Sequence, residues 1–387
     1  SSLVFDGTEL GTKDAYLFHQ NENATLFVSA EDTVEAVSST SLTPTDFRTE
    51  GFTITAPSSF TCGGNTSLRL TAIGEDDTGL TCQTLTGFTG VKDLKAWYAV
   101  NINSAPAADS VTTDLLLDSQ AISDQSEPTA NNLTLTFNSG IADVDIGYAN
   151  AGNVLGINFK HDDAPYDGSI ASFSALVASS SDFVVKPNLI NLSITDANAS
   201  CAVGMVNETC TRFVAAGAPF VLNSEAQCIG GGVADDYQGG IALTHGLVSP
   251  IPSAGIVGSL AINAATFGSA DSGSIQINNQ SISEVGVFSI TATPSAYYGE
   301  TIAPFTLPTV GRFYPDHFIV TSSSTSDSCS GFSYMDQTDS EIDISYTVQA
   351  QRFGGGLVLN YNAAFAKASI SLVAENNNDG GGYQTRL

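Results

Sequence analysis

The chain has no segment of twelve or more residues whose apolar side chains recur with the 3.6-residue period of an amphipathic helix. The straight-chain helix formers Lys, Arg, Glu, Gln and Met are scarce, and charged residues make up only 13% of the sequence. Ser, Thr, Asn and Gly therefore supply most of the polar surface, and these residues favour turns and strands. The sequence predicts an all-β protein.

The charge balance limits the partners of the chain. Its 387 residues include 12 Lys and Arg against 40 Asp and Glu, which gives a net charge of −28. Nucleic acids and anionic membrane surfaces both require basic patches, so neither is expected as a partner. No run reaches eighteen apolar residues, so no membrane contact is expected within this segment. The first residue is Ser1, and no signal-peptide pattern follows it; we interpret the chain as processed or excerpted.

A repeated motif organises most of the sequence. An acidic or turn residue precedes a Phe that opens a β-branched strand, and the three Phe residues are 131 and 135 residues apart: Phe52, Phe183 and Phe318. This spacing is typical of immunoglobulin-like (Ig-like) β-sandwich modules. The sequence therefore predicts a β segment at 1–50, sandwiches at 51–180 and 181–310, and an incomplete third sandwich at 311–387.

Two β-hairpins are predicted from alternating strands around turns. Residues 133–137 and 141–148 alternate on either side of Asn138-Ser139-Gly140, and residues 273–277 and 287–291 flank a turn at Asn278-Asn279.

The incomplete third module has two explanations. The sequence is cut from a longer polypeptide, or the module is completed by a strand that another subunit donates, since an open sandwich edge invites strand addition.

Six cysteines indicate an oxidising compartment. Their spacings contain no CxxC pair, so structural zinc and thioredoxin-like motifs have no support. Cys201 and Cys210 are spaced for a local hairpin crosslink. Disulfides in a secreted protein are the expectation, and buried free thiols in a cytosolic protein are the alternative.

The sequence gives no positive sign of catalysis. None of the four His residues lies in a recognisable catalytic signature, and no GxSxG elbow occurs. We expect a protein that is not an enzyme. The metal hypothesis is calcium at Asp162, Asp163 and Asp167, because these carboxylates and a turn glycine lie between two strands. The alternative is a plain Asx-rich turn.

Several blocks resemble a known family. They look like the large β-rich C-terminal region of MshQ-type proteins, which are bacterial surface proteins encoded with the mannose-sensitive haemagglutinin type IV pilus system. The resemblance covers about residues 50–387. The blocks are Val310–Phe318 (VGRFYPDHF), Gly331–Met335, Tyr361 with Phe365–Ala368, Ser283–Gly286, Phe183–Pro187, Ala216–Phe220 and Gly87–Trp97.

The resemblance implies an extracellular or cell-surface location, a link to pilus assembly or adhesion, tandem Ig-like modules and no enzymatic activity. It also implies a disulfide between Cys62 and Cys82, which lie where that region carries a cysteine pair. The Cys201 and Cys210 pair departs from the family pattern, and the pairing of Cys228 and Cys329 is left open.

The sequence and the resemblance together predict a non-enzymatic structural or adhesion protein of a pilus-associated or filamentous bacterial surface assembly. Its expected partners are other pilus or surface-fibre subunits. One alternative is a self-polymerising fibre subunit completed by strand donation. Another is a carbohydrate-binding β-sandwich module that contacts host or surface glycans, which requires a flat strip of exposed aromatic residues.

Overall fold

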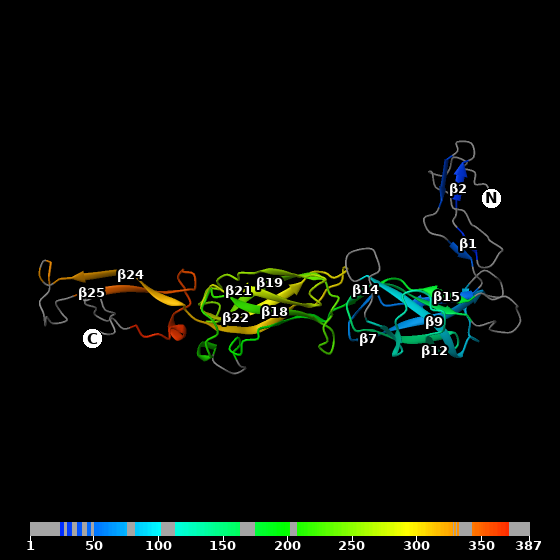
Figure 1. Cartoon of the computed structure of the whole chain (residues 1–387), viewed down its shortest axis with the longest axis horizontal. Coiled ribbons are helices and arrows are strands. Elements are labelled where there is room, and N and C mark those ends of the chain that lie inside the picture. Colours follow the sequence, from blue (N-terminus) through cyan, green and yellow to red (C-terminus); the bar gives the residue numbers. More distant parts are fainter. Residues whose placement is uncertain are drawn as a thin grey trace. The chain divides into compact units, whose positions relative to one another are not determined.

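The computed structural model confirms the all-β fold (Figure 1). Among the residues it describes, the helices are two short 3₁₀ turns, η1 (Asn207–Thr209) and η2 (Ala363–Phe365). None of the described helices has the length and hydropathy to cross a membrane. The structure describes residues 24–26, 29–32, 37–40, 45–47, 50–75, 82–101, 113–162, 175–201, 207–327, 329, 331–332 and 343–370.

The chain divides into two compact units, Ser1–Lys186 and Pro187–Leu387. The first unit begins with four short strands that pair only with one another among the described residues. β1 (Ala24–Leu26) pairs with β4 (Thr45–Phe47), and β2 (Ser29–Asp32) pairs with β3 (Val37–Thr40).

Two six-stranded sheets form the sandwich of the first unit. One sheet has the order β11-β10-β13-β7-β5, with β8 also paired to β7, and the other has the order β12-β9-β14-β16-β6, with β15 also paired to β14. All pairs are antiparallel except β16 with β6. The strands are β5 (Glu50–Thr55), β6 (Ser59–Thr61), β7 (Asn65–Glu75), β8 (Cys82–Thr84), β9 (Gly90–Asn101), β10 (Leu115–Leu117), β11 (Gln120–Ile122), β12 (Leu133–Phe137), β13 (Ile141–Tyr148), β14 (Gly152–His161), β15 (Leu176–Ser179) and β16 (Phe183–Lys186).

The core of this sandwich follows from period-2 alternation. Successive residues of β12 are buried and exposed in turn, so its apolar residues all face inward. Phe137 at the end of β12 lies 4.8 Å from Phe88 and 5.8 Å from Phe52 between ring centroids. Such aromatic clusters bury large apolar areas and so stabilise the contact between sheets.

The second unit contains a smaller sandwich, a three-stranded sheet β17-β18-β21 against a four-stranded sheet β20-β19-β22-β23. Its core includes Phe213, Phe220, Phe288 and Phe313, whose ring centroids lie 5.4–5.9 Å apart in the contacting pairs. The strands are β17 (Leu189–Ser193), β18 (Phe220–Gln227), β19 (Gly239–Ser249), β20 (Ala264–Phe267), β21 (Ser274–Gln280), β22 (Gly286–Pro294) and β23 (Phe305–Phe313).

The predicted hairpins are wrong. The strands and the turn of the first are observed, but the turn predicted at Asn278-Asn279 lies inside β21, which continues to Gln280. β12 pairs with β9, whereas β13 pairs with β7 and β10, so the turn at Asn138–Gly140 carries the chain from one sheet to the other. β21 and β22 are likewise in different sheets of the second unit. Both connections are arches across a sandwich. Alternation and turn chemistry are the same for an arch as for a hairpin, so the local sequence does not distinguish them.

Each Phe of the repeat lies in a strand, but not each one marks the start of a module. Phe52 opens the predicted module at 51 and lies in β5. β16, which contains Phe183, pairs with β14 and β6 of the first unit, and the second unit begins at Pro187.

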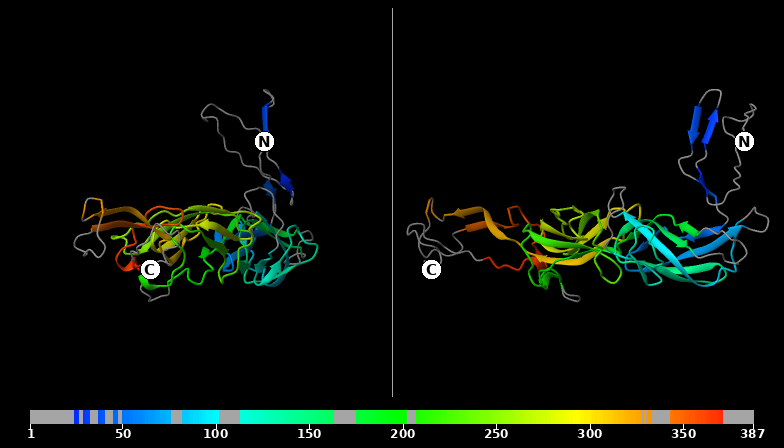
Figure 2. Two further views of the ribbon diagram at one scale, coloured as in Figure 1. Left: turned by 60° about the vertical axis from the view of Figure 1, so that its left-hand side comes forward. Right: turned by 45° about the vertical axis from the view of Figure 1, so that its right-hand side comes forward.

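The second unit ends in a two-stranded ribbon, β24 (His317–Ser326) paired antiparallel with β25 (Asp343–Gln351). Figures 1 and 2 show this ribbon, in orange, continuing from the end of the unit's sandwich. Among the described residues the two strands form a sheet only with each other, and one isolated bridge joins Gln351 at the end of β25 to Leu357.

Candidate functional site

The ribbon of β24 and β25 is uncovered among the described residues. Every residue of β24 is exposed, including Val320 with 58% of its surface accessible. Ribbon residues 318–326 and 344–351 carry no charge, although the chain as a whole has a charge of −28. An uncharged strand pair with one fully exposed strand is unusual on such an acidic chain and marks a candidate interaction surface.

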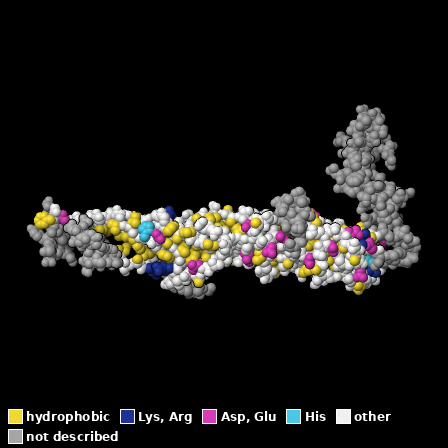
Figure 3. Space-filling model, viewed as in Figure 1, with side chains coloured by type: hydrophobic (Ala, Val, Ile, Leu, Met, Phe, Trp, Pro, Cys, Tyr) yellow, Lys and Arg dark blue, Asp and Glu magenta, His cyan; other side chains and the backbone are white. Residues whose placement is uncertain are grey.

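One face of the ribbon is apolar. The register places Phe318 opposite Ala350 and Val320 opposite Val348, and a bulge after Val320 then brings Tyr346 opposite Ser323. The intervening positions are mainly Ser, Thr and Gln, so the alternation is that of a strand with one buried face. Figure 3 shows hydrophobic side chains gathered over the ribbon and the adjoining end of the sandwich.

The base of the ribbon is fixed by a small apolar cluster. Ala350 at the end of β25 packs with buried residues of three other segments, and Tyr361 lies against the cluster. Phe318 contacts Tyr361 edge-on, with 5.5 Å between ring centroids. The buried members are Ala216, Val285, Ala350, Val358 and Phe365.

A buried polar pair fastens the chain after β25 to the sandwich. The Glu284 carboxylate accepts hydrogen bonds from the backbone N–H groups of Val285, Leu359 and Asn360, at 2.9–3.1 Å. The Asn360 side chain accepts from the Ile256 N–H and donates to the Ile256 and Val285 carbonyls, at 2.8–2.9 Å. Only 4% of Glu284 and 1% of Asn360 are exposed. Buried polar groups satisfied in this way hold a unique arrangement.

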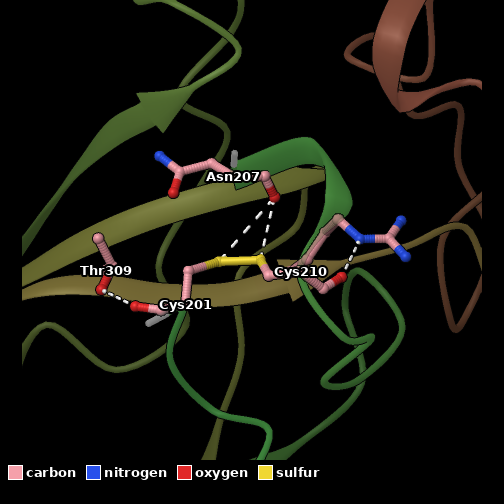
Figure 4. Close-up of a disulfide and its surroundings, with 5 residues drawn as sticks. Cys201, Asn207, Cys210 and Thr309 are labelled. Carbon is pink, nitrogen blue, oxygen red and sulfur yellow. Dashed lines mark hydrogen bonds between the residues drawn. A yellow bond between two sulfur atoms is a disulfide. The ribbon is translucent and has the colours of Figure 1, made fainter. Parts of the chain in front are cut away.

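A disulfide crosslinks the segment beside β23. Cys201 and Cys210 are bonded, as their spacing predicts, and both are buried against Val287 of β22 (Figure 4). The Asn207 carbonyl oxygen lies 3.0 Å from Sγ of Cys210, and the Thr309 hydroxyl donates to the Cys201 carbonyl at 3.3 Å.

The implied partnership of Cys62 with Cys82 is wrong. Cys82 is an exposed free thiol at the start of β8, which pairs with β7 in one sheet. Cys62 is buried next to β6 of the other sheet, and both Cys62 and Cys228 are disulfide-bonded. Cys329 is also a free thiol. The disulfides agree with folding in an oxidising compartment.

The calcium candidate is only partly described. Asp162 pairs with Lys95 and with Lys160, the latter at 3.3 Å, and Glu127 lies 2.6 Å from the same Lys160 amine. The hydrogen bond from Lys95 lowers the pKa of Asp162. Asp163 and Asp167 lie outside the described residues. Within the described ranges no group of three or more candidate ligands is assembled, and two lysines beside Asp162 oppose a cation there.

The described histidines lie apart from one another in structural contacts. The buried ring of His161 bonds the Asp93 carbonyl at 2.9 Å. The half-buried ring of His245 bonds the Val257 carbonyl at 3.1 Å, and its partial burial lowers the pKa of His245. His317 bonds the Asp316 carboxylate at 2.9 Å.

Sequence reasoning missed a pair of arginines near the disulfide. Arg312 donates from Nε to the Cys210 carbonyl at 2.9 Å, and the Arg212 guanidinium lies over the Tyr314 ring, 5.1 Å from its centroid. Burial, and then the charge of Arg212, lower the pKa of Arg312. Because the two arginines are 100 residues apart, no local sequence pattern indicates that they lie close together.

Comparisons with known proteins give two family matches. The profile of DUF6701, first Ig-like domain, a domain of unknown function, matches residues 34–168, and that of DUF6701, third domain, matches residues 284–387. The first description agrees with the observed sandwich. Neither profile names MshQ-type proteins, so that finer resemblance stays a prediction.

Other comparisons add little. No curated protein matches the chain. Among solved structures, the native conformation of Escherichia coli alpha-2-macroglobulin is similar over 72% of this chain, with 13% identity and a TM-score of 0.23. The chain spans 18% of that protein's length, and the TM-score is too low to indicate a shared fold.

Proposed function

Because the chain carries two DUF6701 domains, the first of them Ig-like, we propose that it is a non-enzymatic structural or adhesion protein of a bacterial surface assembly. In the finer form of this proposal the assembly is pilus-associated, as in MshQ-type proteins, and the location is extracellular. The disulfide between Cys201 and Cys210 supports an oxidising location. Sandwiches of this kind present exposed loops and edges to partners.

The main structural support for the proposal is the ribbon of β24 and β25. Its apolar face, with Val320 and Tyr346 exposed, has the composition of the centre of a protein interface, where charged residues are depleted and aromatic residues enriched. Away from the base, where Gln351 is bridged to Leu357, its outer edges also leave backbone hydrogen-bonding groups without a strand partner among the described residues. We expect another subunit of the assembly to cover this surface.

The test uses the full protein in the bacterium that encodes it. Val320→Asp places a charge on the ribbon, and Val91→Asp makes the same change at an exposed valine of β9, 67% of which is accessible. Both variants are expected to be exported and to be cleaved when intact cells are treated with protease. Only Val320→Asp is expected to be lost from the fraction of surface protein that is assembled into high-mass complexes.

Two results contradict the proposal. One is retention of Val320→Asp in the high-mass fraction at the level of Val91→Asp. The other is protection of the wild-type protein from protease in intact cells, because a surface protein is accessible.

The open edges of β24 and β25 also favour strand donation between copies of the chain. This second candidate predicts that the purified full chain forms polymers whose mass grows with concentration. A single mass corresponding to one chain at all concentrations opposes it. The carbohydrate-binding alternative stays a prediction, for which glycan-array binding is the test.

A further inference from the structure

We infer that Arg212 and Arg312 form a receptor for carboxylate groups of an acidic polypeptide. The inference depends on the proposed function only in its choice of a polypeptide ligand. The site itself rests on the geometry of the two arginines.

The backbone holds the two arginines side by side. The Phe213 N–H donates to the Arg312 carbonyl at 2.9 Å, and the Tyr314 N–H donates to the Val214 carbonyl at 3.3 Å, so the segments that carry Arg212 and Arg312 run together. Two cationic groups held this close together repel each other. The arrangement therefore has a cost that an anion between the two guanidinium groups would remove.

The chain does not supply that anion within its described part. Neither arginine forms an ion pair with a described carboxylate, although the sequence contains 40 Asp and Glu. The nearby Asp316 carboxylate instead bonds His317. Glu208, two residues before Cys210, forms no ion pair with a described residue.

Each guanidinium is oriented and still has free donors. Arg312 is half-buried and uses Nε for the Cys210 carbonyl, which leaves its two terminal nitrogens for a bidentate carboxylate. Arg212 is exposed and stacked on the Tyr314 ring, so its position is restricted while its edge remains accessible.

The surroundings favour a polypeptide as the source of the carboxylate. The base of the uncharged ribbon belongs to the same unit, and Tyr361 of its apolar cluster is close enough to Arg312 to influence its pKa. Arginine and aromatic residues beside an apolar surface are typical of protein interfaces. An acidic partner would place apolar side chains on the ribbon and a carboxylate between the arginines.

The test measures binding of fluorescent poly-L-glutamate to the purified full chain at low salt, with polygalacturonate as the acidic-glycan probe. A protein of charge −28 repels both polymers, so binding requires a local cationic site. Arg212→Glu is expected to weaken poly-L-glutamate binding about tenfold or more. The matched control Arg69→Glu makes the same charge change at an exposed arginine of the first unit and is expected to leave affinity unchanged.

Three results overturn the inference. Poly-L-glutamate does not bind the wild-type chain, or Arg212→Glu and Arg69→Glu weaken it equally, which indicates bulk charge alone. The third result is that polygalacturonate binds more tightly than poly-L-glutamate and that its binding requires Arg212. This result would assign the site to acidic glycans. Arg212 is exposed, so unchanged melting of the variant shows that lost binding is not lost folding.

Discussion

Replacing Asn360 by Asp tests how the chain after β25 is fastened to the sandwich. The two side chains have the same shape, but Asp has no N–H to donate. The Ile256 and Val285 carbonyls, 2.8 and 2.9 Å from Nδ2, would face an oxygen, and the new carboxylate would be buried beside Glu284. Two buried hydrogen bonds are lost and a negative charge is buried without a cation to balance it, which together cost about 3–5 kcal/mol of unfolding free energy.

The two units provide an internal control for this measurement. Trp97 is the only tryptophan of the chain and belongs to the first unit, so its fluorescence follows that unit, whereas circular dichroism follows both. In Asn360→Asp we expect a thermal transition of the second unit about 6–20 °C lower, with the Trp97 transition unchanged.

Asn278→Asp is the matched control, because Asn278 is exposed on β21. It makes the same chemical change without burial and should leave both transitions in place. The reasoning is refuted if Asn360→Asp loses less than about 1 kcal/mol, the value of an ordinary substitution. It is also refuted if the Trp97 transition falls equally.

Three further predictions concern other parts of the chain. The double change Cys201→Ser and Cys210→Ser should lower the unfolding free energy of the second unit by about 2.5–3 kcal/mol in denaturant titrations, because the disulfide closes a short loop; Cys82→Ser should have no effect. The lowered pKa of Asp162 means that its ion pairs stabilise the folded state above the unfolded-state pKa of 3.8 and are lost as the pH falls below it. Asp162→Asn should therefore make unfolding of the first unit, followed by Trp97 fluorescence, less sensitive to pH below about 4; an unchanged acid profile contradicts this. Val320→Ser should reduce binding of a hydrophobic dye while changing stability by less than about 0.5 kcal/mol, since Val320 is exposed; a larger loss of stability would show that the ribbon is covered.

The sequence was sufficient for the fold class and for most strands that it singled out. Alternation in residues 133–137 predicts β12, and the Phe at position 52 marks β5, because one-sided burial imposes a period of two. The sequence did not show which strands pair with each other. The turn at Asn138–Gly140 has the residues of a hairpin, yet the chain crosses to the other sheet there, because the partner of each strand is set by segments distant in sequence.

The candidate site shows the same division. Cys201 and Cys210 are near in sequence, and their disulfide was predicted from spacing. Glu284 and Asn360 are 76 residues apart, and Arg212 and Arg312 are 100 apart, so nothing local indicates that the members of either pair lie close together. The exposure of Val320 was not readable either, because an alternating strand looks the same whether or not its apolar face is covered.

The two arches have a consequence for the speed of folding. A hairpin forms early because its strands are close in sequence, but each arch places consecutive strands in different sheets. The first sandwich instead depends on distant pairs, such as Trp97 of β9 with Asn158 of β14. Closing such loops costs entropy before any contact offsets it, so topologies of this kind fold in about milliseconds to seconds. The arches thus delay the formation of a core that local hairpins would begin to assemble earlier.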